Sequence, residues 1–175
     1  MFLRLLFGVA IVVAGVLIFA ATKPSTFHIE KSVSIQAPPE KVYALIADFH
    51  NWPKWAPQDR DDPTMQRTYH GTTIGQGAVS DWTSKGSAGA GRMKIIAATR
   101  PSQVEVAVDW ERPFMLRNSH TFTLTPVGSG ARVVWTAEGT NLYIMKVMEV
   151  FVGVNGLMGK HLEAGLAELK QLAQQ

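Results

Sequence analysis

The sequence predicts an α+β domain that combines an antiparallel sheet with a long C-terminal helix. Side chains alternate between apolar and polar over residues 27–36, which is typical of a half-buried strand. Residues 65–140 form short runs separated by turn residues, which indicates an antiparallel meander. Near the C-terminus, apolar residues recur at helical spacing, namely Met158, Leu162, Leu166, Leu169 and Leu172. A sheet that curves around this helix would enclose a cavity.

Composition limits the classes of protein that the chain can represent. Of its 175 residues, 46% are hydrophobic and 18% are charged, which argues against a disordered chain and a polytopic membrane protein. The 17 basic and 14 acidic residues leave a net charge of +3 without a run of Lys or Arg. Nucleic acid is therefore not an expected partner. The absence of cysteine excludes disulfides, thiolate zinc sites and a Cys nucleophile.

Residues 1–22 are predicted to form a single transmembrane helix. Leu5 to Ala21 is a run of 17 residues without a charged or strongly polar side chain, and a helix over residues 2–22 would be roughly 31 Å long, about the thickness of a hydrocarbon core. A cleaved signal peptide is the alternative, because Arg4 precedes the apolar run. Cleavage after Ala20 or Ala21 would require a small residue where Ile18 or Phe19 stands, so an uncleaved anchor is favoured. We expect the following domain to lie outside the cytoplasm.

The first elements after the anchor follow in the order linker, strand, helix and loop. Residues 23–26 read as a linker, and residues 27–175 as one domain. Lys31 is a charged exception on the apolar face of the first strand. A short amphipathic helix then begins at Pro39 or Glu40, as indicated by the spacing of Val42, Leu45, Ile46 and Phe49.

The prolines of residues 51–57 predict a loop that carries Trp52 and Trp55. These two indoles form either an aromatic gate over a cavity or an anchor that pins the loop to the sheet, and the anchor is favoured. The acidic stretch that follows, Asp59 to Asp62, is expected to be a solvated loop and not a calcium site.

Turn residues divide the meander at residues 71–77, 84–91, 100–102, 111–113 and 128–130. After Asn141 the periodicity becomes helical. Residues 142–154 are apolar at most positions and form either the first part of the C-terminal helix, bent at Gly153 or Gly156, or a lid-like segment.

Taken in order, these segments resemble the START-like (SRPBCC) superfamily, and specifically its bacterial branch of polyketide cyclase/dehydrase-like proteins. The resemblance covers residues 27–173 and depends on the order of its motifs, which are Ile29–Ile35, Ala37–Val42, Asp48, Trp52–Pro57, Gly71–Gly77, Trp82, Gly89–Ile95, Arg132–Trp135 and Gly159–Lys170. It implies a helix-grip fold, with a curved antiparallel sheet around a long C-terminal helix and an apolar cavity between them. It implies no shared catalytic residues, because the superfamily includes lipid carriers, cyclases and regulatory proteins.

Strand parity predicts which side chains face the cavity. The expected ligand-binding residues lie on the inner parity of the strands, with one methionine from the segment after them: Trp82, Met93, Val106, Trp110, Asn118, His120, Phe122, Trp135 and Met148. Met145, Met148 and Met158 are either part of an adaptable pocket or ordinary core, and the core is favoured.

His120 is the titratable residue of greatest interest, because an imidazole on an apolar face can bind a ligand or transfer a proton. The alternative is a core histidine whose nitrogens are satisfied by the backbone or by Asn118. Asp81 is a second candidate, since its parity near a glycine-rich turn is easily shifted by a bulge. No catalytic assignment follows with confidence from either residue.

The sequence contains no motif typical of a metal site, a phosphate-binding loop or a serine nucleophile. The five histidines do not occur at metal-ligand spacing, the glycine-rich stretch from Gly86 to Gly91 lacks the Lys-Ser/Thr of a phosphate loop, and no G-x-S-x-G elbow is present. No metal or cofactor is therefore predicted.

Three functions remain open. The favoured one is a membrane-anchored module, more a binding protein than an enzyme, that holds an apolar small molecule such as a lipid or polyketide-like compound. The others are a cofactor-free cyclase or dehydratase that uses His120 and a regulatory module that binds a protein partner.

Overall fold

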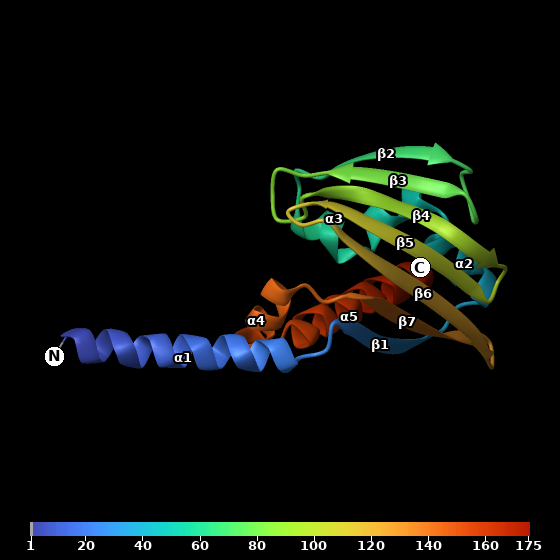
Figure 1. The fold of residues 1–175 in the computed structure, drawn as a ribbon. Helices are drawn as coiled ribbons and strands as arrows, with labels where there is room; N and C mark the ends of the chain where they lie inside the picture. Colours follow the sequence, from blue (N-terminus) through green and yellow to red (C-terminus); the bar gives the residue numbers. More distant parts are fainter. Residues whose placement is uncertain (1) are drawn as a thin grey trace.

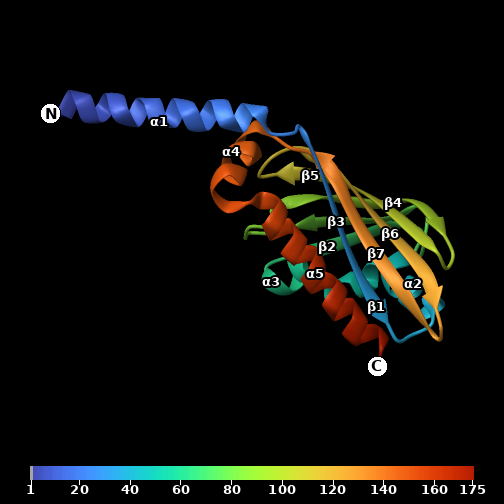
Figure 2. The same cartoon turned by 90° about the horizontal axis from the view of Figure 1, so that it is seen from below.

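The computed structural model describes residues 2–175, apart from the side chains of residues 3, 5, 152, 154 and 155. A seven-stranded antiparallel sheet curves around the C-terminal helix, and a further helix projects from one end of the domain (Figures 1 and 2). The elements are α1 (Phe2–Thr22), β1 (Thr26–Ile35), α2 (Pro39–Ala47), the 3-10 helix η1 (Phe49–Lys54), α3 (Pro57–Asp61), β2 (Gln66–Gly71), β3 (Ala78–Thr83), β4 (Ala90–Thr99), β5 (Gln103–Arg112), β6 (Leu116–Val127), β7 (Gly130–Thr140), α4 (Tyr143–Val152) and α5 (Val154–Ala173).

The strand order is β1-β7-β6-β5-β4-β3-β2, so the first strand pairs with the last and the others form the predicted meander. The register separates two ends of the sheet. One end, here called the α1 end, carries the β3–β4 and β5–β6 turns and the connections to α1 and α4. The pairs that define it are Thr26–Thr140, Asn118–Gly139, Trp110–Leu116, Ala90–Arg112 and Thr83–Ala90.

The opposite end, here called the α2 end, carries the β2–β3, β4–β5 and β6–β7 turns. β1 ends there and leads into α2, and the C-terminus of α5 lies nearby (Figure 1). α2 begins at Pro39, as predicted, and contacts α5 and strands β5 to β7. Its apolar stripe therefore closes this end of the sheet.

The predicted exception on β1 has a structural explanation. Lys31 shares the helix-facing side of the strand with Ile29 and Val33, and its Nζ donates a hydrogen bond to Glu163 of α5 at 2.5 Å. The lysine thus reaches past the core to a partner on the helix surface.

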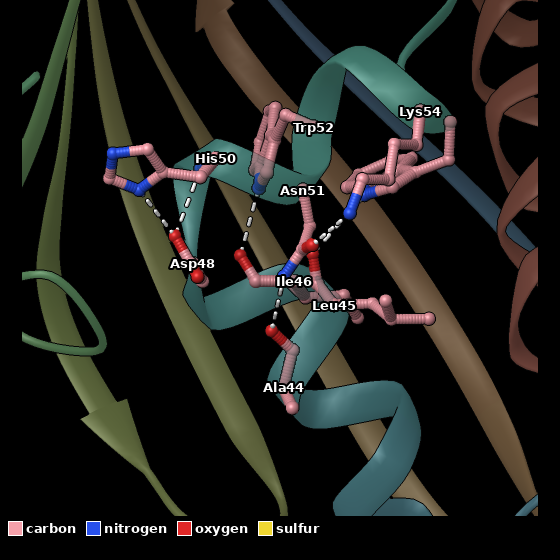
Figure 3. Close-up of polar contacts among 9 residues, drawn as sticks. Ala44, Leu45, Ile46, Asp48, His50, Asn51, Trp52 and Lys54 are labelled. Carbon is pink, nitrogen blue, oxygen red and sulfur yellow. Dashed lines mark hydrogen bonds and ion pairs between the residues drawn. The ribbon is translucent and has the colours of Figure 1, made fainter.

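The two indoles of the WPKW segment hold η1 against α2. Trp52 Nε1 donates to the carbonyl oxygen of Ile46 at 2.8 Å, and Trp55 Nε1 donates to that of Leu45 at 3.2 Å. Figure 3 shows the first of these bonds and the Asp48 side chain that accepts from the backbone N–H of His50 at the start of η1. Both indoles are buried. The anchor interpretation is confirmed in part, because the hydrogen bonds tie the indoles to α2 while both rings also contact Phe122 of the sheet. Most of the predicted loop is 3-10 helix.

The prediction of a solvated loop over residues 59–62 is wrong for two of its three carboxylates, those of Asp59 and Asp62. Residues 57–61 form the short helix α3, and Asp59 makes a bidentate ion pair with Arg67 at 2.6 and 2.7 Å. Both of these side chains are less than one-tenth exposed. Asp62 is buried as well.

The segment after β7 forms a separate helix. α4 ends where Gly153 adopts a left-handed backbone with φ of 63°, and α5 begins at the next residue. The bend predicted at Gly153 is confirmed. The core stripe of α5 is also confirmed at Leu162, Leu166 and Leu169, each at most 2% exposed.

Residues 2–22 are helical, as expected, but the predicted transmembrane span is not supported. Along the described part of the chain, no helix combines the length and the apolar character that a bilayer crossing requires. Met1, the first residue of the segment predicted as an anchor, lies outside the described residues. α1 contacts α4 at its C-terminal half, where Tyr143 donates its hydroxyl proton to the Leu17 carbonyl oxygen at 2.8 Å.

A cluster of aromatic side chains fills the middle of the interior between the sheet and α5. Phe122 lies at its centre, with ring centroids 4.8 Å from Trp135 and 6.0 Å from both Trp52 and Trp55. The enclosed space that remains beside Trp135 is about 30 Å³, about the volume of one water molecule. The predicted apolar cavity is therefore absent from the described interior, because the indoles of Trp52 and Trp55 occupy it.

Candidate functional site

A groove at the α1 end of the domain is the candidate site. It has a volume of about 420 Å³, lies between α3, α5, the β3–β4 turn and the adjoining ends of β5 and β6, and is open to solvent. Apolar side chains line it together with several polar ones: Gln58, Asp61, Asp62, Ser87, Ala88, Trp110, Asn118, His120, Leu157, Met158, His161 and Leu162. We call this set of residues the groove.

Two indoles in contact support the β5 side of the groove. The Trp82 and Trp110 rings lie 5.0 Å apart in an edge-to-face arrangement. Gly91 pairs with both residues across the sheet, and a Cβ at this position would lie 2.5 Å from the Trp82 ring. Glycine at this position therefore makes room for the pair. Trp82 is buried behind Trp110, which is the indole that reaches the groove.

His120 extends from β6 into the groove and is held in one neutral form. Trp135 Nε1 lies 2.9 Å from its Nδ1. Because an indole N–H can only donate, Nδ1 is the acceptor and the ring proton of neutral His120 lies on Nε2. Burial, together with a smaller effect of the nearby His161, lowers the pKa of His120 to about 4. At neutral pH, His120 therefore offers the groove a hydrogen-bond donor without a positive charge.

His161 of α5 brings a second imidazole to the same groove. Burial lowers its pKa as well, opposed in part by Asp61. His161 is not among the candidate residues predicted from the sequence. A signal was available, because His161 follows Met158 by three positions and therefore lies beside the core stripe of α5.

Asn118 supplies an amide next to Trp110. In the orientation that satisfies both of its neighbours, its Oδ1 accepts from Trp110 Nε1 at 3.3 Å and its Nδ2 donates to the Arg117 carbonyl oxygen at 2.9 Å. This amide orients the indole. One alternative from the sequence was a hydrogen bond between Asn118 and His120. In the structure, His120 Nδ1 accepts from Trp135 instead.

Asp62 lies on the α3 side of the groove, where its role is structural. Its carboxylate accepts hydrogen bonds from the hydroxyls of Ser84 and Thr64, the latter at 2.6 Å, and these bonds lower its pKa. The carboxylate thereby ties the end of α3 to the β3–β4 turn.

Asp81, the second catalytic candidate, does not reach the groove. It lies on the opposite face of β3 from Trp82 and Ser80, which are buried. Its carboxylate accepts from Arg92 Nε at 2.6 Å and lies 3.1 Å from His70 Nε2, and the bond from Arg92 is the main cause of its lowered pKa. The structure therefore makes Asp81 part of a surface ion-pair network.

The other predicted ligand-binding residues fall into three groups. Trp110, Asn118 and His120 line the groove. Met148 is 49% exposed on α4 and lies outside the groove lining. The remainder are buried core residues, of which Met93 and Trp135 also border the small enclosed space: Trp82, Met93, Val106, Phe122 and Trp135. Among the described side chains, no three His, Cys, Asp or Glu residues converge to hold a metal ion.

Comparison with solved structures identifies the fold. The di-domain aromatase/cyclase StfQ from the steffimycin biosynthetic pathway matches with a TM-score of 0.65 at 11% identity, over 85% of this chain and 50% of that one. The Aha1 dimer from Colwellia psychrerythraea matches with a TM-score of 0.59 at 17% identity, over 85% and 96%. A protein of Chromobacterium violaceum has the same score and identity, over 87% and 99%.

Comparison at the level of sequence families agrees with the fold. No curated protein matches the chain significantly. A family model described as "polyketide cyclase / dehydrase and lipid transport" matches residues 26–174, which include every strand and every groove residue. The chain therefore belongs to the polyketide cyclase/dehydrase and lipid transport family of the START-like superfamily.

Proposed function

We propose that this protein binds a small molecule with an apolar body and one hydrogen-bond acceptor, such as a carbonyl-bearing polyketide or lipid. The observation that carries the proposal is the neutral imidazole of His120. Its Nδ1 accepts a hydrogen bond from Trp135, so its Nε2–H is the donor that a ligand can use. A donor without charge matches a neutral oxygen acceptor on an apolar compound.

The size and lining of the groove support this proposal. Its volume of about 420 Å³ lies within the usual range of ligand pockets, about 300–1,000 Å³. Trp110, Met158 and Leu162 provide apolar contact, and polar side chains such as His120 and Asn118 lie beside them. The family description includes both polyketide chemistry and lipid transport, and both ligand classes have this mixed character.

We also propose that α1 attaches the domain to a membrane. Its described apolar side chains are exposed in several directions around the helix, including Ile11, Val12 and Val13 at 58%, 65% and 51%. Consecutive helical residues point about 100° apart, so no single protein face covers all three. A lipid environment would surround the helix and cover all three side chains. The extracytoplasmic location of the domain stays a prediction.

Native mass spectrometry of the full-length protein, extracted in mild detergent, tests the binding function. Met158→Trp fills the groove, whereas Val127→Trp adds an indole at the exposed β6–β7 turn of the α2 end. We expect a co-purified small molecule on the wild type and on Val127→Trp, and a loss of about tenfold or more in occupancy on Met158→Trp. Equal occupancy of the two variants, or a wild type without any bound molecule, would contradict the proposal.

A cofactor-free cyclase or dehydratase is the second candidate, favoured by the two imidazoles that share the groove. The Nε2–H of His120 polarises a carbonyl, while neutral His161 accepts a proton from the adjacent carbon. If the substrate carries a hydroxyl on the next carbon, that C–O bond then breaks as a carbon–carbon double bond forms, and the hydroxyl leaves as water with the proton that His161 has taken. In the His161→Gln variant, we expect the co-purified molecule to be heavier by one water than in the wild type. An unchanged mass excludes the dehydratase.

A further inference from the structure

We propose that the α1 end of the domain docks onto a phospholipid bilayer, so that the groove opens toward the lipid. The proposal rests on the attachment of α1 to a membrane and adds a second, separate contact made by the folded domain itself. It identifies the bilayer as the place from which the groove takes its ligand.

Exposed apolar side chains are distributed unequally between the two ends. Outside α1, ten large hydrophobic residues are exposed among those described, and seven of them belong to the β5–β6 turn, to α4 or to the first turn of α5. We call these seven the docking face: Phe114, Met115, Tyr143, Ile144, Met148, Phe151 and Leu157. The other three, Ile74, Ile96 and Val127, lie away from the α1 end.

Two members of the docking face are exposed far beyond what packing requires. Met115 is 85% exposed at the tip of the β5–β6 turn, and Phe151 is 70% exposed near the end of α4. Side chains of this kind are typical of segments that insert into the interface of a bilayer.

The position of α1 determines which partner covers this face. α4 packs beside the C-terminal half of α1, and the bond from Tyr143 to the Leu17 carbonyl oxygen fixes their contact (Figure 2). A bilayer that surrounds the exposed part of α1 therefore meets α4 without any movement of the domain. Leu157 belongs both to the docking face and to the groove, so the mouth of the groove lies at the same boundary.

Site-specific fluorescence quenching in vesicles tests the contact. Because the chain has no cysteine, a single introduced cysteine carries an environment-sensitive fluorophore at one defined position. Four full-length variants are reconstituted into phosphatidylcholine vesicles with and without doxyl-labelled lipid. Met115→Cys and Phe151→Cys report docking, Phe7→Cys reports attachment, and Val127→Cys is the control from the α2 end, all at exposed positions.

The proposal predicts that doxyl lipid reduces the emission of the labels at positions 7, 115 and 151 by roughly threefold or more, while the label at position 127 is unchanged. Quenching at position 7 alone would show that the docking face does not contact the bilayer, while the attachment of α1 to the membrane would still hold. If position 7 also escapes quenching, the attachment fails as well. Labels at 115 and 151 that are shielded from water but unquenched would overturn the proposal in favour of a protein partner.

Discussion

The two ends of the sheet differ in how their apolar side chains are used. At the α2 end, Ile35, Ile46 and Ala173 are at most 1% exposed, because α2 and the C-terminal part of α5 close over the strands. At the α1 end, Trp110 and Met158 stay partly accessible in a groove of about 420 Å³, and Met115 is fully open. One sheet and one helix thus provide a packed core at one end and an open groove at the other.

The aromatic cluster separates these two environments. Trp52, Trp55, Phe122 and Trp135 fill the middle of the grip, and the groove at the α1 end reaches inward to His120. Variants can therefore be sorted by which of the two environments they disturb.

The largest effect is expected from Phe122→Ala, which removes the centre of the aromatic cluster. Phe122 is fully buried, and such truncations cost about 3–5 kcal/mol of unfolding free energy. Urea denaturation measures the change. Val127→Ala at the exposed β6–β7 turn is the control and should change stability by less than about 0.5 kcal/mol. Similar small values for both variants would mean that the interior is not packed as described.

Asp59→Ala should destabilise the domain by about 3 kcal/mol, because it leaves the Arg67 guanidinium buried without its partner. Arg67→Met combined with Asp59→Leu should restore part of the loss. Denaturant midpoints of the single and double variants measure both effects. A double variant less stable than Asp59→Ala would show that the ion pair is not the reason for the loss.

Acid should weaken the fold through His120. The pKa of its imidazole is about 4 in the folded protein against an ordinary value of 6.5. Between these values the unfolded chain binds a proton that the folded chain does not, so stability is full above pH 6.5 and falls as the pH drops toward 4. Reduced for partial solvent screening, this loss is about 2 kcal/mol.

Denaturant midpoints between pH 4 and 7 measure this dependence. His120→Gln should show a flatter profile, since its amide oxygen can still accept from Trp135 but does not titrate in this range. A variant with the same slope as the wild type would remove His120 as the cause.

The smallest effect is expected from Asp81→Asn, which breaks a partly exposed ion pair with Arg92 on the outer face of the sheet. We expect a loss of at most about 1 kcal/mol and unchanged ligand occupancy in native mass spectrometry. A loss of ligand in this variant would indicate that the ligand binds on the outer face of the sheet and not in the groove.

Most of the fold could be predicted from the sequence because its elements carry strong periodic signals. The alternation of β1 and the leucine stripe of α5 depend on burial of one face, which strand and helix geometry impose directly. Lys31 broke the alternation because its partner, Glu163, is 132 residues away along the chain, and no local pattern reveals such a pair.

The site was harder to predict because parity gives the direction of a side chain but not the space in front of it. His120 and Trp110 were identified correctly as inward-facing, whereas the cavity expected around Phe122 is filled by the two indoles of the WPKW segment. Asp62 and Asp59 resembled solvated residues because their partners, Ser84 and Arg67, belong to other elements. His161 required knowledge of which face of α5 turns toward β6.

The binding of a carbonyl compound at His120 is tested most directly by infrared spectroscopy. The probe is 2-acetylnaphthalene, an aromatic ketone with one acceptor, titrated into wild type, His120→Phe and Met158→Trp. We expect saturable binding to the wild type with a carbonyl band at lower frequency than on His120→Phe, and no saturable binding to Met158→Trp. Equal carbonyl frequencies on wild type and His120→Phe, or equal binding to all three proteins, would contradict this prediction.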